Sequence, residues 1–284
     1  MNNDAPLGIV YGMPADQYHA IDALSNSALS MLNRSPRHYW ANYLNPDRPE
    51  RSATAAMAAG TLAHSLVLEP GTVSNLYAVR PEGMDGRTKE GKQWAADNAG
   101  RIIVTAEQMA TAEAQRAAVL AVPDLAELLA SGSPEVSAFW IDHETGTHCK
   151  MRADWVHPLA DGRVILLDLK TTQDASPEQF GRSVWTYGYH RQDAWYTRGF
   201  ALAGGPEVAA FVFAAVTGSY PFIAVPYTLD DQARWQGQEE CDELLATYAE
   251  CRNSNNWPAY GDGVQMLSLP GWAQRDMETE VSYV

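Results

Sequence analysis

The sequence predicts a mixed α/β fold in which an antiparallel meander of strands is flanked by helices on both sides. Residues 24–129 carry helical patterns. From Glu135 to Lys170 the pattern changes to short segments rich in Val, Ile, Phe and Trp, which turn residues separate. Helical patterns return after Pro177. Helices before and after a run of strands are typical of one sheet packed between helices.

The first half of the chain predicts three helices, over residues 24–44, 55–68 and 105–129. Ser25 or Ser27 is placed to cap the first helix, and the Pro70-Gly71 pair ends the second. Pro123 interrupts the third. Residues 80–101 are polar, basic and glycine-rich, so we expect a flexible loop there.

The second half predicts the meander, over residues 135–141, 148–157 and 163–170. A helical region follows from Ser176 to about Ala203, with an interruption at Gly181 or Gly188. Two more strands are expected over 208–217 and 221–227, and then an acidic amphipathic helix over 230–252. The remaining tail is irregular, and its apolar residues available for docking are Trp257, Leu267, Leu269 and Trp272.

The composition is that of an ordinary globular protein, with 284 residues, 46% hydrophobic and 19% charged. The apolar runs are all shorter than the roughly 18 residues of a membrane span, so we expect no membrane association. The first 14 residues lack a signal-peptide pattern, and the three cysteines show no paired metal spacing. These features predict a cytoplasmic protein.

The net charge of −15 argues at first against nucleic acid, because DNA binding draws on basic contacts to phosphate. The charge is uneven, however. Residues 201–284 hold 3 basic and 12 acidic side chains, whereas residues 1–200 hold 17 basic and 23 acidic ones. The basic residues gather at 80–101 and 150–198. Local fields can steer a polyanion, although scattered cations on a solvated acidic surface explain the charge equally well.

The central motif is Asp154 followed by Asp168-Leu169-Lys170. Side chains alternate along a strand, so Asp168 and Lys170 share one face. If the turn centres on Asp161, facing residues sum to 322, which places Asp154 opposite Asp168. Two adjacent carboxylates repel unless a cation lies between them, and Mg²⁺ or Mn²⁺ prefers such oxygen ligands. The alternative is a structural ion pair at the end of a strand.

Two further groups could complete such a site. His64 follows Gly60 in the alanine-rich helix, where neutral imidazole could bind a metal or simply fill the core. Gln192 and Tyr196 are four residues apart, so they project from one helix face. Gln192 could hold a water or phosphate and Tyr196 could pack beside it, or both could be ordinary helix positions.

These motifs together resemble the RecB-type branch of the PD-(D/E)XK nucleases, and most closely the RecE-like exonucleases (exodeoxyribonuclease VIII). The order is Gly60-x-x-x-His64, Asp154, Asp168-x-Lys170 and Gln192-x-x-x-Tyr196. Further similar stretches span nearly the whole chain, at 24–29, 60–70, 104–107, 168–172, 189–194 and 267–272. The resemblance implies a restriction-endonuclease-like core, with a central mixed sheet that contains the meander.

The resemblance also implies a chemistry. His64, Asp154, Asp168 and the Leu169 carbonyl would bind Mg²⁺, or Mn²⁺ in its place. Asp154 and Asp168 would be catalytic, Lys170 and Gln192 would act on the attacking water, and Tyr196 would support the site. Glu135 is a weaker candidate. The residues that we expect to contact DNA are Arg87, Lys89, Lys92, Arg152 and Arg191.

The implied activity is 5′→3′ digestion of double-stranded DNA ends, which leaves a 3′ single strand for a RecT-like single-strand annealing protein. The implied assembly is a ring-shaped homo-oligomer, with a tetramer favoured. We expect one nuclease domain over 1–284, with an N-terminal helical wrap (1–53), a catalytic core (54–252) and a docking tail (253–284).

The sequence departs from RecE in two respects, and two alternatives stay open. RecE carries a long N-terminal region without a counterpart here, and Ala153 stands where relatives often have Pro. An endonuclease or single-strand nuclease could share the fold. So could a non-catalytic module that binds DNA ends for recombination, although such a module has no need to hold two carboxylates together.

Overall fold

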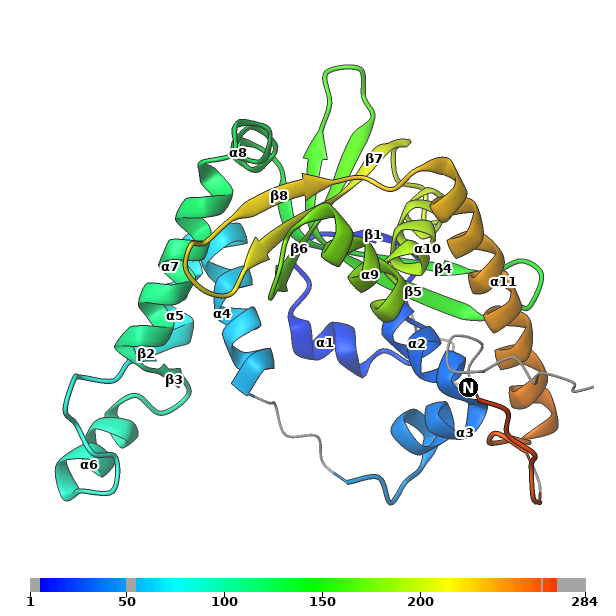
Figure 1. The fold of residues 1–284 in the computed structure, drawn as a ribbon, viewed down its shortest axis with the longest axis horizontal. Coiled ribbons are helices and arrows are strands. Elements are labelled where there is room, and N and C mark those ends of the chain that lie inside the picture. The colour runs from blue at the N-terminus through cyan, green and yellow to red at the C-terminus, as the bar shows by residue number, and fades with distance from the viewer. Residues whose placement is uncertain (1–5, 50–54, 262, 270–284) are drawn as a thin grey trace, which may run out of the picture.

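A computed structural model describes residues 6–49, 55–261 and 263–269. Its centre is a six-stranded sheet in the order β1-β4-β5-β6-β7-β8 (Figure 1). The strands are β1 (Gly8–Val10), β4 (Ser133–Ile141), β5 (His148–Pro158), β6 (Val164–Thr172), β7 (Val208–Thr217) and β8 (Ala224–Tyr227). Strands β6 and β7 are parallel and the other neighbours are antiparallel. The predicted mixed sheet with an antiparallel meander is therefore confirmed.

The meander has the predicted register. Trp155 pairs with Leu167 and Val156 with Leu166, and both pairs sum to 322. Beyond the Trp155–Leu167 pair the two strands part, because β5 continues along β4 while β6 continues along β7. The sheet therefore forks between β5 and β6, and Asp154 and Asp168 are the first residues of the fork, so the register holds but these two residues do not form the expected ladder pair.

Two consecutive helices carry the chain from β6 to the parallel strand β7. They are α9 (Pro177–Tyr187) and α10 (Tyr189–Leu202), and Gly188 separates them with a φ of 69°. This is the left-handed conformation that glycine adopts without a steric penalty. A βαβ crossover of this kind is what two parallel neighbouring strands require.

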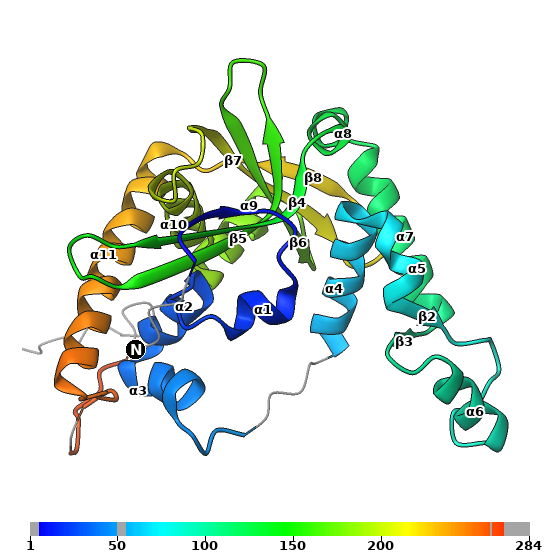
Figure 2. The same cartoon turned by 180° about the vertical axis from the view of Figure 1, so that it is seen from behind.

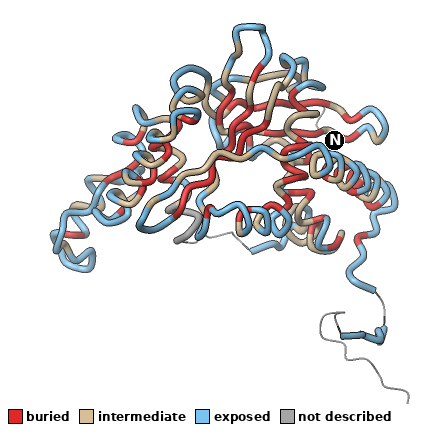
Figure 3. Tube along the Cα trace, turned by 45° about the horizontal axis from the view of Figure 1, so that its top comes forward, coloured by how far each residue is buried: buried red, intermediate tan, exposed pale blue. Residues whose placement is uncertain are grey.

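Helices cover both faces of the sheet. One face packs against α2 (Asn26–Arg34), α9, α10 and α11 (Asp231–Ser254), and the other against α4 (Ala55–Leu68), α7 (Ala106–Leu120) and α8 (Pro123–Ala130). Figure 3 shows buried residues concentrated in the strands and on the helix sides that face them. Ser25 caps α2, Thr105 forms a capping box on α7, and Pro123 begins α8.

The N-terminal part lies along the open side of the fork. Strand β1 pairs with β4 at the edge of the sheet (Figure 2). It is followed by α1 (Ala15–Ala20), α2, α3 (Pro36–Tyr39) and the π-helix η1 (Trp40–Leu44). The predicted helix over 24–44 is thus three consecutive segments, because Ser35 adopts an extended conformation and caps α3.

The expected flexible loop at residues 80–101 is wrong in part. The helix α6 (Lys89–Asp97) begins there, because the Thr88 side chain accepts the Gly91 N–H at 3.1 Å. Around it lie the 3₁₀-helix η2 (Pro70–Thr72), α5 (Val73–Leu76), β2 (Tyr77–Val79) and β3 (Ile102–Val104). The short parallel strands β2 and β3 pair with each other, and this pairing holds together the two ends of the segment that contains α6. Figure 1 shows α6 at the tip of this segment, away from the sheet.

The tail docks through one of the expected residues. Trp257 is buried and stacks on Tyr39 with ring centroids 5.2 Å apart. Leu267 and Leu269 are 89% and 66% exposed, so these two side chains are much less buried than Trp257, and docking through them stays a prediction. Trp272 lies outside the described residues. Within the described part of the chain, no helix is long and apolar enough to span a membrane.

Candidate active site

The fork between β5 and β6 brings together the residues of the predicted motif. Asp168 and Lys170 share a face of β6, and Lys170 Nζ lies 2.6 Å from Asp168 Oδ2. Gln192, on α10, donates its side-chain N–H to Asp168 Oδ1. Asp168 is 3% exposed, so its charge is removed from water and depends on these two partners.

Asp154 is held from the opposite side by α4. His64 Nε2 lies 3.2 Å from Asp154 Oδ2, and the same oxygen accepts the Leu169 N–H at 2.9 Å. The Gly60 carbonyl lies 2.8 Å from His64 Nδ1, which fixes the ring orientation. Gly60 and His64 are four residues apart, so the ring of His64 bonds to the carbonyl one helical turn before it.

Charge sets the protonation of these groups. Burial lowers the pKa of His64, but Asp154 beside it outweighs burial and raises that pKa to about 9. Burial would raise the pKa of Asp154, yet His64 holds it below the ordinary value. Burial and the Asp154 charge raise the pKa of Asp168 to about 6. Asp154 is therefore ionised at neutral pH, whereas Asp168 has a pKa close enough to neutral pH to take up a proton more easily.

Lys170 is held as an ammonium. Burial lowers its pKa, but charge interactions, above all with Asp168 and then with Tyr189 and Asp154, outweigh burial and the pKa is raised. Lys170 Nζ lies 4.5 Å from the centroid of the Tyr189 ring, at cation–π distance. A group held so firmly in its charged form offsets negative charge better than it removes a proton from water.

Asp154, Lys170 and Gln192 line a cavity with a volume of about 1360 Å³. Two other predicted residues, Tyr196 and Glu135, line it too. Tyr196 packs edge-on against Phe211 at 5.8 Å, and burial raises its pKa well above the ordinary value. Glu135 lies on β4 with a φ of 53°, and its Oε2 accepts the Arg152 Nε–H at 2.6 Å. A non-glycine residue in this conformation costs about 1–3 kcal/mol, and such residues are enriched at functional sites.

The donor set fits a hard divalent cation in its chemistry. Asp154 and Asp168 supply two neighbouring carboxylates, and Asp168 Oδ2, although near Lys170, has no well-directed hydrogen bond among the described residues. His64 could add a nitrogen ligand by giving up its proton. As the side chains stand in the described residues, no three His, Cys, Asp or Glu groups already converge on one ion position.

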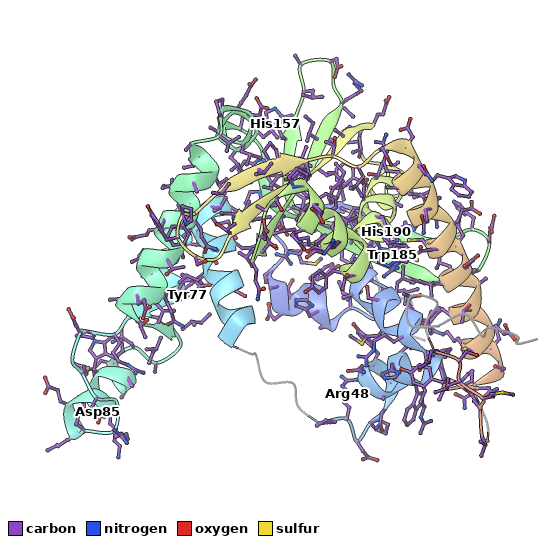
Figure 4. The ribbon with its side chains drawn as sticks, in the orientation of Figure 1. Arg48, Tyr77, Asp85, His157, Trp185 and His190 are labelled. Carbon is purple, nitrogen blue, oxygen red and sulfur yellow. The ribbon has the colours of Figure 1, made fainter. Side chains whose placement is uncertain are left out.

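The residues expected to contact DNA separate into three places. Arg87 is paired with Asp85, and Asp85 lies at the far tip near α6, together with Lys89 and Lys92 (Figure 4). Arg152 lines the cavity beside the carboxylates. These residues therefore do not form one DNA-binding surface in this structure.

Arg191 requires a correction. It is 6% exposed, and its Nη1 donates to Glu240 Oε2 on α11 at 2.6 Å. The same oxygen lies 3.0 Å from His190 Nε2, and the exposed Trp185 ring stacks on His190 (Figure 4). A guanidinium buried in an ion pair between two helices is not accessible to a phosphate group, so this structure does not present Arg191 to DNA.

Sequence reasoning missed Lys150 and gave Tyr189 no role. Lys150 lines the same cavity, and it stands four residues before Asp154 on β5. Residues i, i+2 and i+4 follow one side of a strand, so the series Lys150, Arg152, Asp154 was the available signal. No local pattern indicated Tyr189, because its contact with Lys170 joins helix α10 to strand β6.

The comparisons with known proteins agree with this geometry. Residues 25–270 match the family described as PDDEXK-like domain of unknown function (DUF3799). The chain belongs to this family. The predicted PD-(D/E)XK nuclease fold is therefore confirmed, and nucleases of this type generally use divalent metals. The closer resemblance to RecE stays a prediction.

This DUF3799 domain is also similar to solved structures. A candidate exonuclease from Eubacterium rectale has 15% sequence identity and a TM-score of 0.57, with 87% of this chain and 88% of that chain covered. A second structure, of the protein SSO0001, has 14% identity over 41% of this chain and 50% of that chain, with a TM-score of 0.28. No curated protein matches the DUF3799 domain.

Proposed function

We propose that this protein is a metal-dependent DNA exonuclease that hydrolyses phosphodiester bonds in the fork between β5 and β6. The observation that carries the proposal is the meeting of Asp154, Asp168 and Lys170 from two strands. Two buried carboxylates beside an ammonium are costly for stability alone. They are what phosphoryl transfer needs, since it depends on positioning and charge stabilisation.

In this proposal each side chain has a separate task. Asp154, Asp168, the Leu169 carbonyl and His64 hold Mg²⁺, or Mn²⁺ in its place. When bound, the ion supplies Lewis-acid polarisation of the phosphoryl oxygen and a more acidic water. Lys170 offsets the charge that develops on the phosphate, with Tyr189 holding its ammonium from behind. Gln192 fixes Asp168 and orients the water, and Tyr196 supports Gln192.

The polarity, the DNA substrate and the partner that we propose come from the resemblance to RecE. We propose 5′→3′ digestion of linear duplex DNA, which leaves 3′ single strands for a single-strand annealing protein of the RecT kind. We also propose a ring-shaped homotetramer, whose cavity openings face the DNA while acidic surfaces point outward. Such a division of surfaces would reconcile DNA binding with the net charge of −15.

The test uses end-labelled linear duplex and covalently closed circular DNA, each with Mg²⁺ and with a chelator. We expect the linear duplex to be digested from its ends only with Mg²⁺, and the circles to stay closed. Asp168→Ala and Lys170→Ala should each lower the rate by at least roughly a thousandfold, since each removes charge stabilisation at the reacting phosphate. The control is Arg182→Gln, because Arg182 is exposed on α9.

Three results would contradict the proposal. Full activity of either variant would remove the catalytic assignment, and nicking of circles would make the protein an endonuclease. Release of label from the 3′ end first would reverse the polarity. Circular dichroism separates loss of catalysis from loss of fold, and sedimentation with and without DNA tests the tetramer.

A further inference from the structure

Lys150 is a buried cation that lacks an anionic partner. It is 6% exposed near the start of β5, and its Nζ donates to the carbonyl oxygens of Tyr18 at 2.9 Å and Ile21 at 2.7 Å. Both partners are neutral, and among the described residues Lys150 forms no salt bridge. Burial lowers the pKa of Lys150 to about 8. A buried charge of this kind is expensive unless an anion joins it.

Arg152 stands next to Lys150 along the same strand and also has unused capacity. Its Nε donates to Glu135 and its Nη2 to the Met13 carbonyl at 2.8 Å. Its buried Nη1 has no hydrogen-bond partner among the described residues. The Tyr18 ring lies against both cations, 4.7 Å from Lys150 Nζ and 5.4 Å from the Arg152 guanidinium carbon.

Both cations line the cavity that contains Asp154 and Lys170. Each step of two residues along a strand covers about 6.6 Å. Arg152 and Lys150 therefore stand one and two such steps from Asp154, a spacing close to that of successive phosphates in an extended strand. The amino end of α2 lines the cavity too, and a helix amino end favours anions.

The cavity also contains acidic groups, and their positions decide what it can bind. Glu135 is paired with Arg152, and Asp154 belongs to the fork. Asp22 lines the cavity on the side of Lys150 without forming a salt bridge to it in the described residues. No carboxylate of the described residues therefore contacts Lys150 directly, and Arg48, labelled in Figure 4, adds another cation at the exposed rim.

We propose that Lys150 and Arg152 form a phosphate-binding subsite that holds the substrate strand one to two nucleotides from the scissile bond. The inference rests on the proposed function. The phosphate can be the terminal group of a DNA end or an internal phosphodiester, since both present the same oxygens to a lysine and an arginine. The subsite fixes the strand along β5 without reading its sequence.

The test measures binding in the presence of a chelator, so that cleavage does not contribute. Oligonucleotides carry one neutral methylphosphonate linkage at successive positions from the end, or end in a phosphate or a hydroxyl. We expect a methylphosphonate linkage at one or two of these positions to weaken binding to the wild-type protein roughly tenfold. That loss should be absent in Lys150→Met and in Arg152→Gln, because these variants no longer bind the phosphate in question.

Salt dependence provides a second measure. Loss of one phosphate contact lowers the slope of log K against log salt by about 0.7 for a single strand. Lys150→Arg should restore binding that Lys150→Met loses, which separates charge from packing, and Arg182→Gln should behave as the wild type. A position-dependent loss limited to the terminal phosphate assigns the subsite to the chain end, and an internal one assigns it to the continuing strand.

The proposal is overturned if Lys150→Met binds as tightly as the wild type with the same salt slope, or if every linkage contributes equally. These outcomes differ from failure of the nuclease assignment, which is absence of hydrolysis by the wild type with Mg²⁺. The methylphosphonate series with wild-type protein gives the answer even if Lys150→Met does not fold.

Discussion

Two neighbouring carboxylates of this protein take opposite pKa shifts. Asp154 is bonded to His64 and to the Leu169 N–H, so its pKa is held low despite burial. Asp168 is buried beside that charge, so its pKa rises to about 6 even with Lys170 at 2.6 Å. The contrast arises from the partners and not from the residue type, which is the same.

Asp193 offers a test of buried charge outside the reacting groups. It is 1% exposed, its Oδ2 has no hydrogen-bond partner among the described residues, and burial raises its pKa to about 6. A raised acid pKa favours folding at low pH, and this contribution is lost as the pH rises from about 4 through 6. Asp193→Asn should therefore stabilise the fold by roughly 1–3 kcal/mol at pH 7.5.

Chemical unfolding at pH 4.5 and pH 7.5 measures this effect. The gain from Asp193→Asn should be much smaller at pH 4.5, because Asp193 is then protonated in the folded protein. Asn can still accept the Thr197 hydroxyl that Asp193 Oδ1 accepts at 3.2 Å. An equal gain at both pH values would show that the charge of Asp193 is not its cause.

At the scale of elements, α10 is the helix that connects the site to the core. It buries Trp195 and Phe200 for packing and, on the same helix, Gln192 for the site. Strand β5 contacts it from one side, where the Trp195 ring N–H donates to the Lys150 carbonyl at 3.1 Å, and α11 from the other. Its position therefore sets where Gln192 meets Asp168.

Gly237 is the residue that lets α11 approach α10. A Cβ there would lie 2.1 Å from the His190 carbonyl oxygen, which is backbone and cannot move aside cheaply. We expect Gly237→Ala to destabilise the protein by about 1–3 kcal/mol, as overpacking does. The measurement is the midpoint and slope of urea unfolding, together with nuclease activity, since a displaced α10 also displaces Gln192.

Gly181→Ala on α9 is the matched control. A Cβ at Gly181 would meet nothing within 4 Å, so alanine should stabilise this helix by about 0.5–1 kcal/mol. If both substitutions changed stability in the same direction, close helix packing would not be the cause.

At the scale of the whole molecule, charge is divided between regions. The last 84 residues hold 12 acidic and 3 basic side chains, and α11, which carries many of them, lies at the opposite edge from α4 and α6 (Figure 1). The cations near the site are few and are held in the cavity. Salt should therefore affect DNA binding through local contacts more than through net charge.

A divalent ion at the fork should stabilise the folded protein as a whole. At about 100 times its Kd an ion that binds only the folded state adds about 2.7 kcal/mol. We expect Mg²⁺ or Mn²⁺ to raise the Tm by roughly 5 °C or more, as measured by calorimetry. Asp168→Asn should abolish the shift without lowering the Tm of the metal-free protein, because it also removes a repulsion.

Asp161→Asn is the control for this experiment, since Asp161 is exposed in the turn between β5 and β6 and pairs with Arg163. Its Tm should respond to the metal as the wild type does. A shift that survives in Asp168→Asn would place the ion elsewhere.

Local sequence patterns were sufficient to predict the α/β class, the order of the main core elements and the register of the β5–β6 hairpin. These follow from local patterns: alternation from 135 to 170, serine and threonine caps, and a turn length that fixes which residues face each other. The strand pattern also predicted that Asp154, Asp168 and Lys170 lie close together, because charges in an apolar strand call for a reason, and the family resemblance added His64 and Gln192 to this group.

The surroundings of those residues depend on long-range packing, which could not be predicted from local patterns. The fork depends on β6 leaving β5 for β7, a pairing between segments separated by two helices. The buried ion pair of Arg191, the Tyr189 ring beneath Lys170 and the unpaired charge of Lys150 depend on helices that pack from afar. Burial and long-range contacts set these environments, and local sequence patterns carry no record of them.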